Sequence, residues 1–216
     1  MKKSVYSLVL MDEVVEAIDQ LAYAKGTSRS QLINELLAEK VALSTPQQRL
    51  QKVFEELSTY LSPHQRFQIQ NQAAEHMYSI KSALRYKYNP TIRYSFYINQ
   101  QQGTLEGQLR IISRTQSAVL SQYLQNFFFL WAQLENEKHQ VVWQQEEGVK
   151  WLRILKLQGF NSPQNAPYLA SYLSEYIKAL DSALGLYFMQ IEKGVHHPEE
   201  LQTHYKNYCQ GLKVLI

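Results

Sequence analysis

Residues 2–41 decide the organisation that the sequence predicts: KKSVYSLVLMDEVVEAIDQLAYAKGTSRSQLINELLAEKV. Residues 4–10 alternate as a short β-strand does, with successive side chains on opposite faces. One face would carry Tyr6, Leu8 and Leu10, and the other would carry Val5, Ser7 and Val9. No further strand-like run appears before residue 91. A lone strand with two open edges is unstable in water, so this strand needs a partner from elsewhere.

Two amphipathic helices are predicted directly after this strand. Asp12 and Glu13 suit the first turn of a helix because its dipole favours negative charge there. Gly26 ends the first helix, and Thr27 or Ser28 caps the second. The apolar faces of the two helices are formed by Val14, Val15, Ile18, Leu21 and Ala22, and by Leu32, Ile33, Leu36, Leu37 and Val41.

A unit of this size cannot bury its apolar faces alone. A second copy of the chain solves both problems, because two strands 4–10 can pair antiparallel and the four helices can share one core. We therefore expect a homodimer through residues 4–10 and the two following helices. A two-stranded ribbon of this kind fits the major groove of double-stranded DNA.

The stretch resembles the ribbon-helix-helix domains of the Arc/MetJ/CopG class. The matching features are the basic N-terminus before a short strand, the helix DEVVEAIDQLA and the turn GTSRSQLI. This family consists mostly of dimeric DNA-binding regulators, including repressors, antitoxins and plasmid-maintenance proteins. The resemblance implies base contacts from Lys3, Val5, Ser7 and Val9. It implies phosphate contacts from Lys2, Thr27, Ser28 and Arg29.

Two domains are predicted, with the resemblance confined to residues 1–44. Residues 46–216 are expected to form a mostly helical domain of unknown role with one small β-hairpin, so the predicted fold class is mainly α. Pro46 suits the first position of a helix. The expected helices span 46–60, 62–87, 117–138 and 164–193, with a last one from Pro198. The expected hairpin pairs 91–98 with 108–116 across a loop, and 139–157 fits either short strands or a helix.

Composition limits the function classes. The 216 residues are 45% hydrophobic and 19% charged, so the chain can bury a core and is not disordered. A net charge of +3 permits an anionic partner without demanding one. Cys209 is the single cysteine, which excludes an intrachain disulfide and fits a reducing cytoplasm. The apolar run NFFFLWAQL is too short to span a bilayer, so we expect a soluble cytoplasmic protein without membrane contact.

A second basic patch is a candidate in the segment KSALRYKYNPTIRYSFYI. It interleaves tyrosines with the cations Lys81, Arg85, Lys87 and Arg93, a pattern found on nucleic-acid and anion-binding surfaces. Arg110 and Arg114 would extend the patch if the hairpin pairs as expected. The other interpretation is an ordinary amphipathic segment with solvated charges.

Catalytic and metal signals are weak. Of the six histidines, His197 with His204 and His196 with Glu200 come near helical ligand spacing, and surface roles explain them as well. Glu146-Glu147 and Glu199-Glu200 are adjacent pairs that point in different directions, and no nucleophile or phosphate-loop motif is present. We therefore expect neither an enzyme nor a bound metal or cofactor.

The sequence thus predicts a DNA-binding regulatory protein, acting in transcription or in plasmid or mobile-element maintenance. The C-terminal domain would bind a small-molecule effector or a protein partner, or add oligomer contacts. The alternative is an antitoxin-like interaction module in which the N-terminal arm mainly dimerises. An enzyme domain fused to a DNA-binding arm is a third hypothesis.

Overall fold

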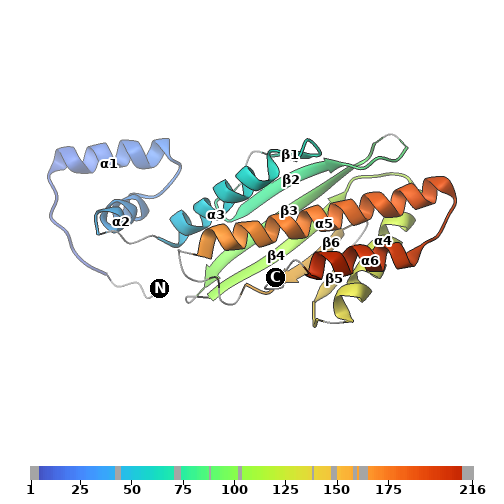
Figure 1. The fold of residues 1–216 in the computed structure, drawn as a ribbon. Helices are drawn as coiled ribbons and strands as arrows, with labels where there is room; N and C mark the ends of the chain where they lie inside the picture. The colour runs from blue at the N-terminus through green and yellow to red at the C-terminus, as the bar shows by residue number, and fades with distance from the viewer. Residues whose placement is uncertain are drawn as a thin grey trace. The chain divides into compact units, whose positions relative to one another are not determined.

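The structure is a computed structural model, and it describes residues 5–41, 45–70, 74–87, 89–101, 104–137, 139–146, 150–157, 160 and 165–210. The chain divides into two compact units, Met1–Arg49 and Leu50–Ile216. Its described residues form six helices and six strands. Figure 1 colours them in chain order from blue to red. None of the helices within the described ranges is long and apolar enough to cross a membrane.

The first unit contains two helices, α1 (Asp12–Ala24) and α2 (Arg29–Lys40). Both helices were expected from the sequence, and both are confirmed. Their contact buries Ile18, Ala22 and Leu32, against which Val14 and Ile33 pack. Residues 5–10 form no strand.

The second unit is built on a six-stranded sheet in which all neighbouring strands are antiparallel, in the order β1-β2-β3-β4-β6-β5. The strands are β1 (Phe67–Ile69), β2 (Met77–Ala83), β3 (Thr91–Gln101), β4 (Thr104–Ser113), β5 (Trp143–Glu146) and β6 (Lys150–Leu155). The long hairpin β3–β4 pairs over its whole length, from Ile92 opposite Ser113 to Gln101 opposite Thr104.

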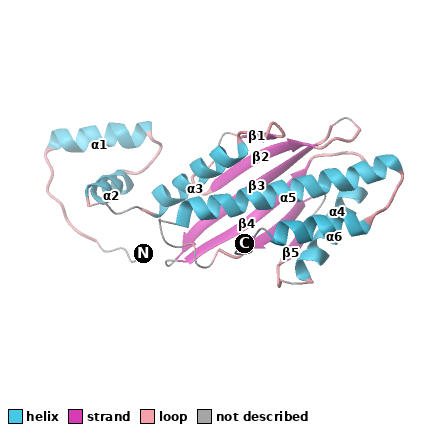
Figure 2. Cartoon of the chain, viewed as in Figure 1, coloured by secondary structure: helices cyan, strands magenta, loops and turns pink. Residues whose placement is uncertain are grey.

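Four helices accompany the sheet: α3 (Pro46–Leu61), α4 (Ala118–Asn136), α5 (Ala166–Lys193) and α6 (Pro198–Gln210). One hydrophobic core joins all four to inward-facing strand residues such as Ile80, Phe96 and Trp151. Figure 2 shows α3, α5 and α6 across the near face of the sheet. The second unit therefore has two layers, and the far face of the sheet carries none of these helices.

The predicted fold class, an N-terminal ribbon followed by a mostly helical domain, is wrong. The centre of the chain is a six-stranded antiparallel sheet rather than one small hairpin. In the single chain, residues 5–10 form no strand, and the ribbon of the prediction would require a second copy of the chain.

Two segment predictions are also wrong, while four helices are confirmed. The predicted helix 62–87 contains β1 and β2, because alternate residues Tyr78, Ile80 and Ser82 are buried against the helices. The predicted loop 99–107 is largely strand, since pairing continues to Gln101 and resumes at Thr104. Residues 139–157, left open between strand and helix, contain β5 and β6. The helices expected at 46–60, 117–138 and 164–193 and from Pro198 are present.

Candidate nucleic-acid interface

The turn between α1 and α2 is fixed by a glycine. Gly26 has a φ of 63°, which L-residues with side chains adopt at a cost. Its N–H donates to the carbonyl of Tyr23 at 3.1 Å, and the N–H of Thr27 donates to the carbonyl of Ala22 at 2.9 Å. These two bonds form the Schellman motif that ends many helices. The motif sets where α2 begins.

The N-terminus of α2 is the part of the first unit best suited to an anion. Ser28 is the N-cap, and its hydroxyl accepts a hydrogen bond from the N–H of Gln31 at 3.2 Å. The first N–H groups of a helix have no carbonyl partner within it, and its dipole favours negative charge there. Thr27 lies beside the cap, and its Oγ1 is buried with no hydrogen-bond partner among the residues that the structure describes. The predicted phosphate residues Thr27, Ser28 and Arg29 are therefore adjacent to one helix N-terminus.

Arg29 already has a partner in this structure. Its guanidinium forms a bidentate ion pair with the carboxylate of Asp19, which lies on α1. The hydrogen bond from Arg29 lowers the pKa of Asp19, and the same bond raises the pKa of Arg29. The side chains remain 53% and 44% exposed, so solvent and salt reach the pair. A phosphate at α2 would have to compete with Asp19 for this guanidinium.

Three of the predicted base-contacting residues, Val5, Ser7 and Val9, lie in the segment before α1, which forms no strand. Val5 and Val9 are fully exposed, at 99% and 102% of their reference areas, and Ser7 is exposed as well. Lys2 and Lys3 lie outside the described residues. The structure thus places Val5, Ser7 and Val9 in one exposed segment.

The first unit exposes far more apolar surface than the second in proportion to its length. Among the described residues, eleven of twenty exposed large hydrophobic side chains lie between Val5 and Val41. They are Val5, Tyr6, Leu8, Val9, Leu10, Met11, Leu21, Tyr23, Leu36, Leu37 and Val41. Among the described residues of this unit, the buried apolar side chains are Ile18, Ala22 and Leu32. Exposed apolar side chains at this density are typical of surfaces that bind another molecule.

The second basic patch is spread over the sheet and its rim. Lys81 on β2 lies directly opposite Arg93 on β3. Arg85 and Lys87 follow β2 and are exposed in the turn before β3. Arg110 on β4 pairs with Ser95, two residues from Arg93, and its guanidinium lies 4.7 Å from the ring centre of Tyr97. The sheet therefore places Lys81, Arg93 and Arg110 on three neighbouring strands.

A buried ion pair that the sequence did not predict joins α4 to β6. Arg153 on β6 donates from Nε to Oε2 of Glu135 on α4 at 2.9 Å, and both side chains are fully buried. Trp143 Nε1 donates to the same oxygen at 2.6 Å. The guanidinium also lies 4.4 Å from the ring centre of Tyr176. The only signals in the sequence were single charges inside apolar runs, LWAQLEN and KWLRIL.

Several polar atoms around this pair have no hydrogen-bond partner among the described residues. They are Arg153 Nη1 and Nη2, Glu135 Oε1, Tyr205 Oη and Tyr208 Oη. Burial raises the pKa of Tyr176 well above its usual value, and the nearby carboxylate of Glu135 adds to the shift. Unpartnered buried groups of this kind are commonly bonded to internal water.

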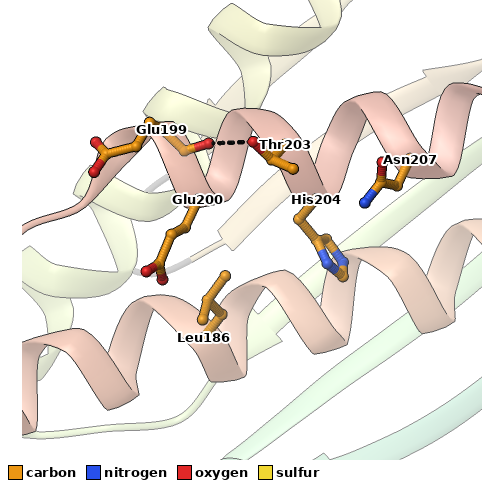
Figure 3. Close-up of a pocket in the computed structure, with 6 residues that line it drawn as sticks. All are labelled: Leu186, Glu199, Glu200, Thr203, His204 and Asn207. Atoms are coloured by element: carbon orange, nitrogen blue, oxygen red, sulfur yellow. Dashed lines mark hydrogen bonds between the residues drawn. The ribbon is translucent and has the colours of Figure 1, made fainter.

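A shallow cleft between α5 and α6 contains Glu199, Glu200 and His204 (Figure 3). Its polar groups already have partners. Glu200 Oε2 accepts from Gln190 Nε2 at 2.9 Å, and His204 Nε2 is 3.0 Å from the carbonyl oxygen of Ala179. Thr203 donates to the backbone carbonyl of Glu199 at 2.8 Å, the dashed line in Figure 3. These contacts stabilise the packing of α6.

The histidine and carboxylate pairs considered as metal or acid–base sites are not assembled. His197 Nδ1 is 3.0 Å from a carboxylate oxygen of Glu199, whereas His204 contacts α5. In the described ranges, no group of three or more His, Cys, Asp or Glu side chains is arranged to hold a metal ion. Glu147 lies outside those ranges.

Comparison with protein-family models, with curated proteins and with solved structures finds no match to this chain.

Proposed function

We propose that this chain is a homodimeric DNA-binding regulatory protein of the cytoplasm, whose first unit contacts double-stranded DNA. The observation that carries the proposal is the apolar surface between Val5 and Val41, which the single chain leaves in water. Burying a fully exposed Val or Leu side chain would stabilise the protein by about 1.5–3 kcal/mol. A second copy can cover this surface, and in doing so it supplies the core that the first unit lacks.

In the proposed dimer, residues 4–10 of the two chains pair with each other. The segment alternates as a β-strand does, so two copies can pair antiparallel across a two-fold axis. Tyr6, Leu8 and Leu10 would then face the helices. Val5, Ser7 and Val9 would face outward, where serine hydroxyls bond to base edges and valines contact thymine methyl groups.

Phosphate contacts would flank these base contacts. The N-terminus of α2, with Thr27, Ser28 and Arg29, offers N–H groups and a positive charge to a phosphate. Lys2 and Lys3 add charge next to residues 4–10. Such contacts make binding depend on salt, because each neutralised phosphate releases counterions.

A fluorescence-polarisation titration of the full chain with random duplex DNA tests the proposal. We expect binding at about 50 mM salt that weakens steeply towards about 200 mM. Arg29→Gln should weaken binding and flatten the salt dependence. Lys193→Gln, at the exposed end of α5, is the matched control and should change neither. Absence of binding at low salt, or binding indifferent to salt, would refute DNA binding.

A further inference from the structure

The sheet of the second unit has one face without helices, and that face carries an unusual row of cations. Side chains of a strand alternate between the two faces of its sheet. In β3, Ile92, Tyr94 and Phe96 belong to the helix-covered core, so Arg93 points to the opposite side. The pairing places Lys81 of β2 and Arg110 of β4 on that same side.

The cations stand close together. Lys81 and Arg93 are direct cross-strand neighbours, whose Cβ atoms are about 5 Å apart in such pairs. Arg110 is diagonal to Arg93, at about 7–8 Å in this geometry. Like charges directly opposite each other destabilise a sheet. The opposed cations Lys81 and Arg93 therefore cost stability, so their presence points to a function for the positive charge.

Acidic residues do not neutralise this row within the part of the chain that the structure describes. No ion pair is formed by Lys81, Arg93 or Arg110 there. Glu106 shares the face but lies near the far end of β4, opposite Asn99. Glu146 shares it too, and it is opposite Lys150 at the other edge of the sheet. The positive charge is therefore concentrated on β2, β3 and β4.

An aromatic ring adjoins the row. Tyr97 lies on the same face of β3, and the guanidinium of Arg110 covers one side of its ring at 4.7 Å from the centre. His76 is the next ring, 6.4 Å away. Arg110 Nε is buried and has no hydrogen-bond partner among the described residues. Ser79 and Ser95 are opposite each other on the same face, and their hydroxyl oxygens are joined by a 2.7 Å hydrogen bond.

We propose that this face binds single-stranded nucleic acid. Lys81, Arg93 and Arg110 contact successive phosphates, and a base stacks on Tyr97. A cationic track beside an aromatic ring is the arrangement that such sites use. Bases reach an aromatic side chain only when they are unpaired, which favours a single strand over a duplex. The site is independent of the duplex-binding surface proposed for the first unit.

The test is a polarisation titration of the full chain with labelled oligothymidylate and oligouridylate. Three phosphate contacts predict an affinity that falls about 20-fold between about 50 and about 200 mM salt. Lys81→Gln/Arg93→Gln leaves one contact, so the fall should shrink to about threefold. The melting temperature of this variant should stay the same or rise, because the like-charge repulsion is gone. A merely structural role would lower it.

Lys150→Gln is the matched control, because Lys150 shares the face but has Glu146 opposite it. It should leave the dissociation constant for single strands within twofold of the parent value. Arg29→Gln should spare single-strand binding, which separates this site from the first unit.

Three outcomes would overturn the proposal. The double variant could bind single strands as well as the parent does. It could lose duplex binding alone, which would make the face an accessory duplex surface. Polyglutamate could compete as effectively as unlabelled oligothymidylate, which would assign the face to an acidic protein partner.

Discussion

At the scale of single residues, the ion pair of Arg153 and Glu135 takes two charges out of water in the second unit. Both side chains are fully buried, and only one oxygen of Glu135 receives the hydrogen bonds of Arg153 and Trp143. Taking two charges out of water costs several kcal/mol per ion, which their attraction only partly offsets. The pair therefore fixes how α4 meets β6 without adding much net stability.

Breaking this pair from one side should destabilise the fold. Glu135→Ala leaves the guanidinium of Arg153 buried and unpaired, which typically costs about 3–5 kcal/mol. Urea unfolding followed by tryptophan fluorescence measures the loss. Glu137→Ala, an exposed site just after α4, should change stability by less than about 0.5 kcal/mol. Equal losses for the two variants would contradict a special role for Glu135.

Asp181 predicts a pH dependence of stability. Burial raises its pKa, and this outweighs the opposing effect of Arg66, whose Nη2 is 3.2 Å from Oδ2. A carboxyl group with a raised pKa favours folding most when protonated, so its contribution is lost as the pH rises through the folded-state pKa. Asp181→Asn should therefore gain stability relative to the parent between about pH 4 and about pH 7.

Urea unfolding at the two pH values checks this prediction. Asparagine keeps an oxygen that can accept the 3.0 Å hydrogen bond from Tyr94 Oη, so the comparison isolates the charge. A difference between variant and parent that is constant with pH would show that Asp181 titrates normally.

At the scale of elements, an ion pair between α1 and α2 involves Arg29, a residue that we propose contacts a DNA phosphate. Asp19 occupies the guanidinium of Arg29. Asp19→Asn should remove the carboxylate that competes with a phosphate for Arg29, so duplex affinity should rise at low salt while the number of phosphate contacts stays the same. A polarisation titration measures the affinity, and an unchanged affinity would place Arg29 away from DNA.

The elements also show what the sequence could and could not predict. Helices with caps and long apolar periods were predictable, as Gly26 and Ser28 illustrate at the α1–α2 turn. The strand β2 was not, because MYSIKSA contains residues common in helices and its alternation appears only once β1 and β3 flank it. Pairing between distant segments overrides weak local preference.

The candidate sites were predictable to different degrees. Lys81 and Arg93 were selected from a basic and aromatic segment, whereas their direct opposition required the register of β2 and β3. Asp19 was missed as the partner of Arg29 because the two lie ten positions apart on different helices. Arg153 and Glu135 were missed because a single charge in an apolar run carries no information about a partner.

At the scale of the whole molecule, the two units differ in how much of their own core they supply. The second unit buries an extensive core between its sheet and four helices. Among its described residues, the first unit buries three apolar side chains and exposes eleven large ones. We therefore expect folding of the first unit to be coupled to association, so its stability should depend on protein concentration.

A variant of the exposed apolar surface tests this coupling. Leu37→Lys places a charge where a second copy would pack, on a side chain that is 54% exposed in the single chain. It should weaken dimerisation and duplex binding together while the melting of the second unit stays unchanged. Phe129→Lys, on an exposed site of α4, is the matched control and should leave the dimer intact. If only Phe129→Lys abolished the dimer, the dimer interface would include α4 rather than the first unit.

Sedimentation equilibrium of the purified chain over a range of concentrations tests the central claim most directly. Two chains sharing residues 4–10 predict a species of twice the chain mass of 25.3 kDa, dissociating only at low concentration. A folded species that remains at 25.3 kDa at every concentration would contradict it.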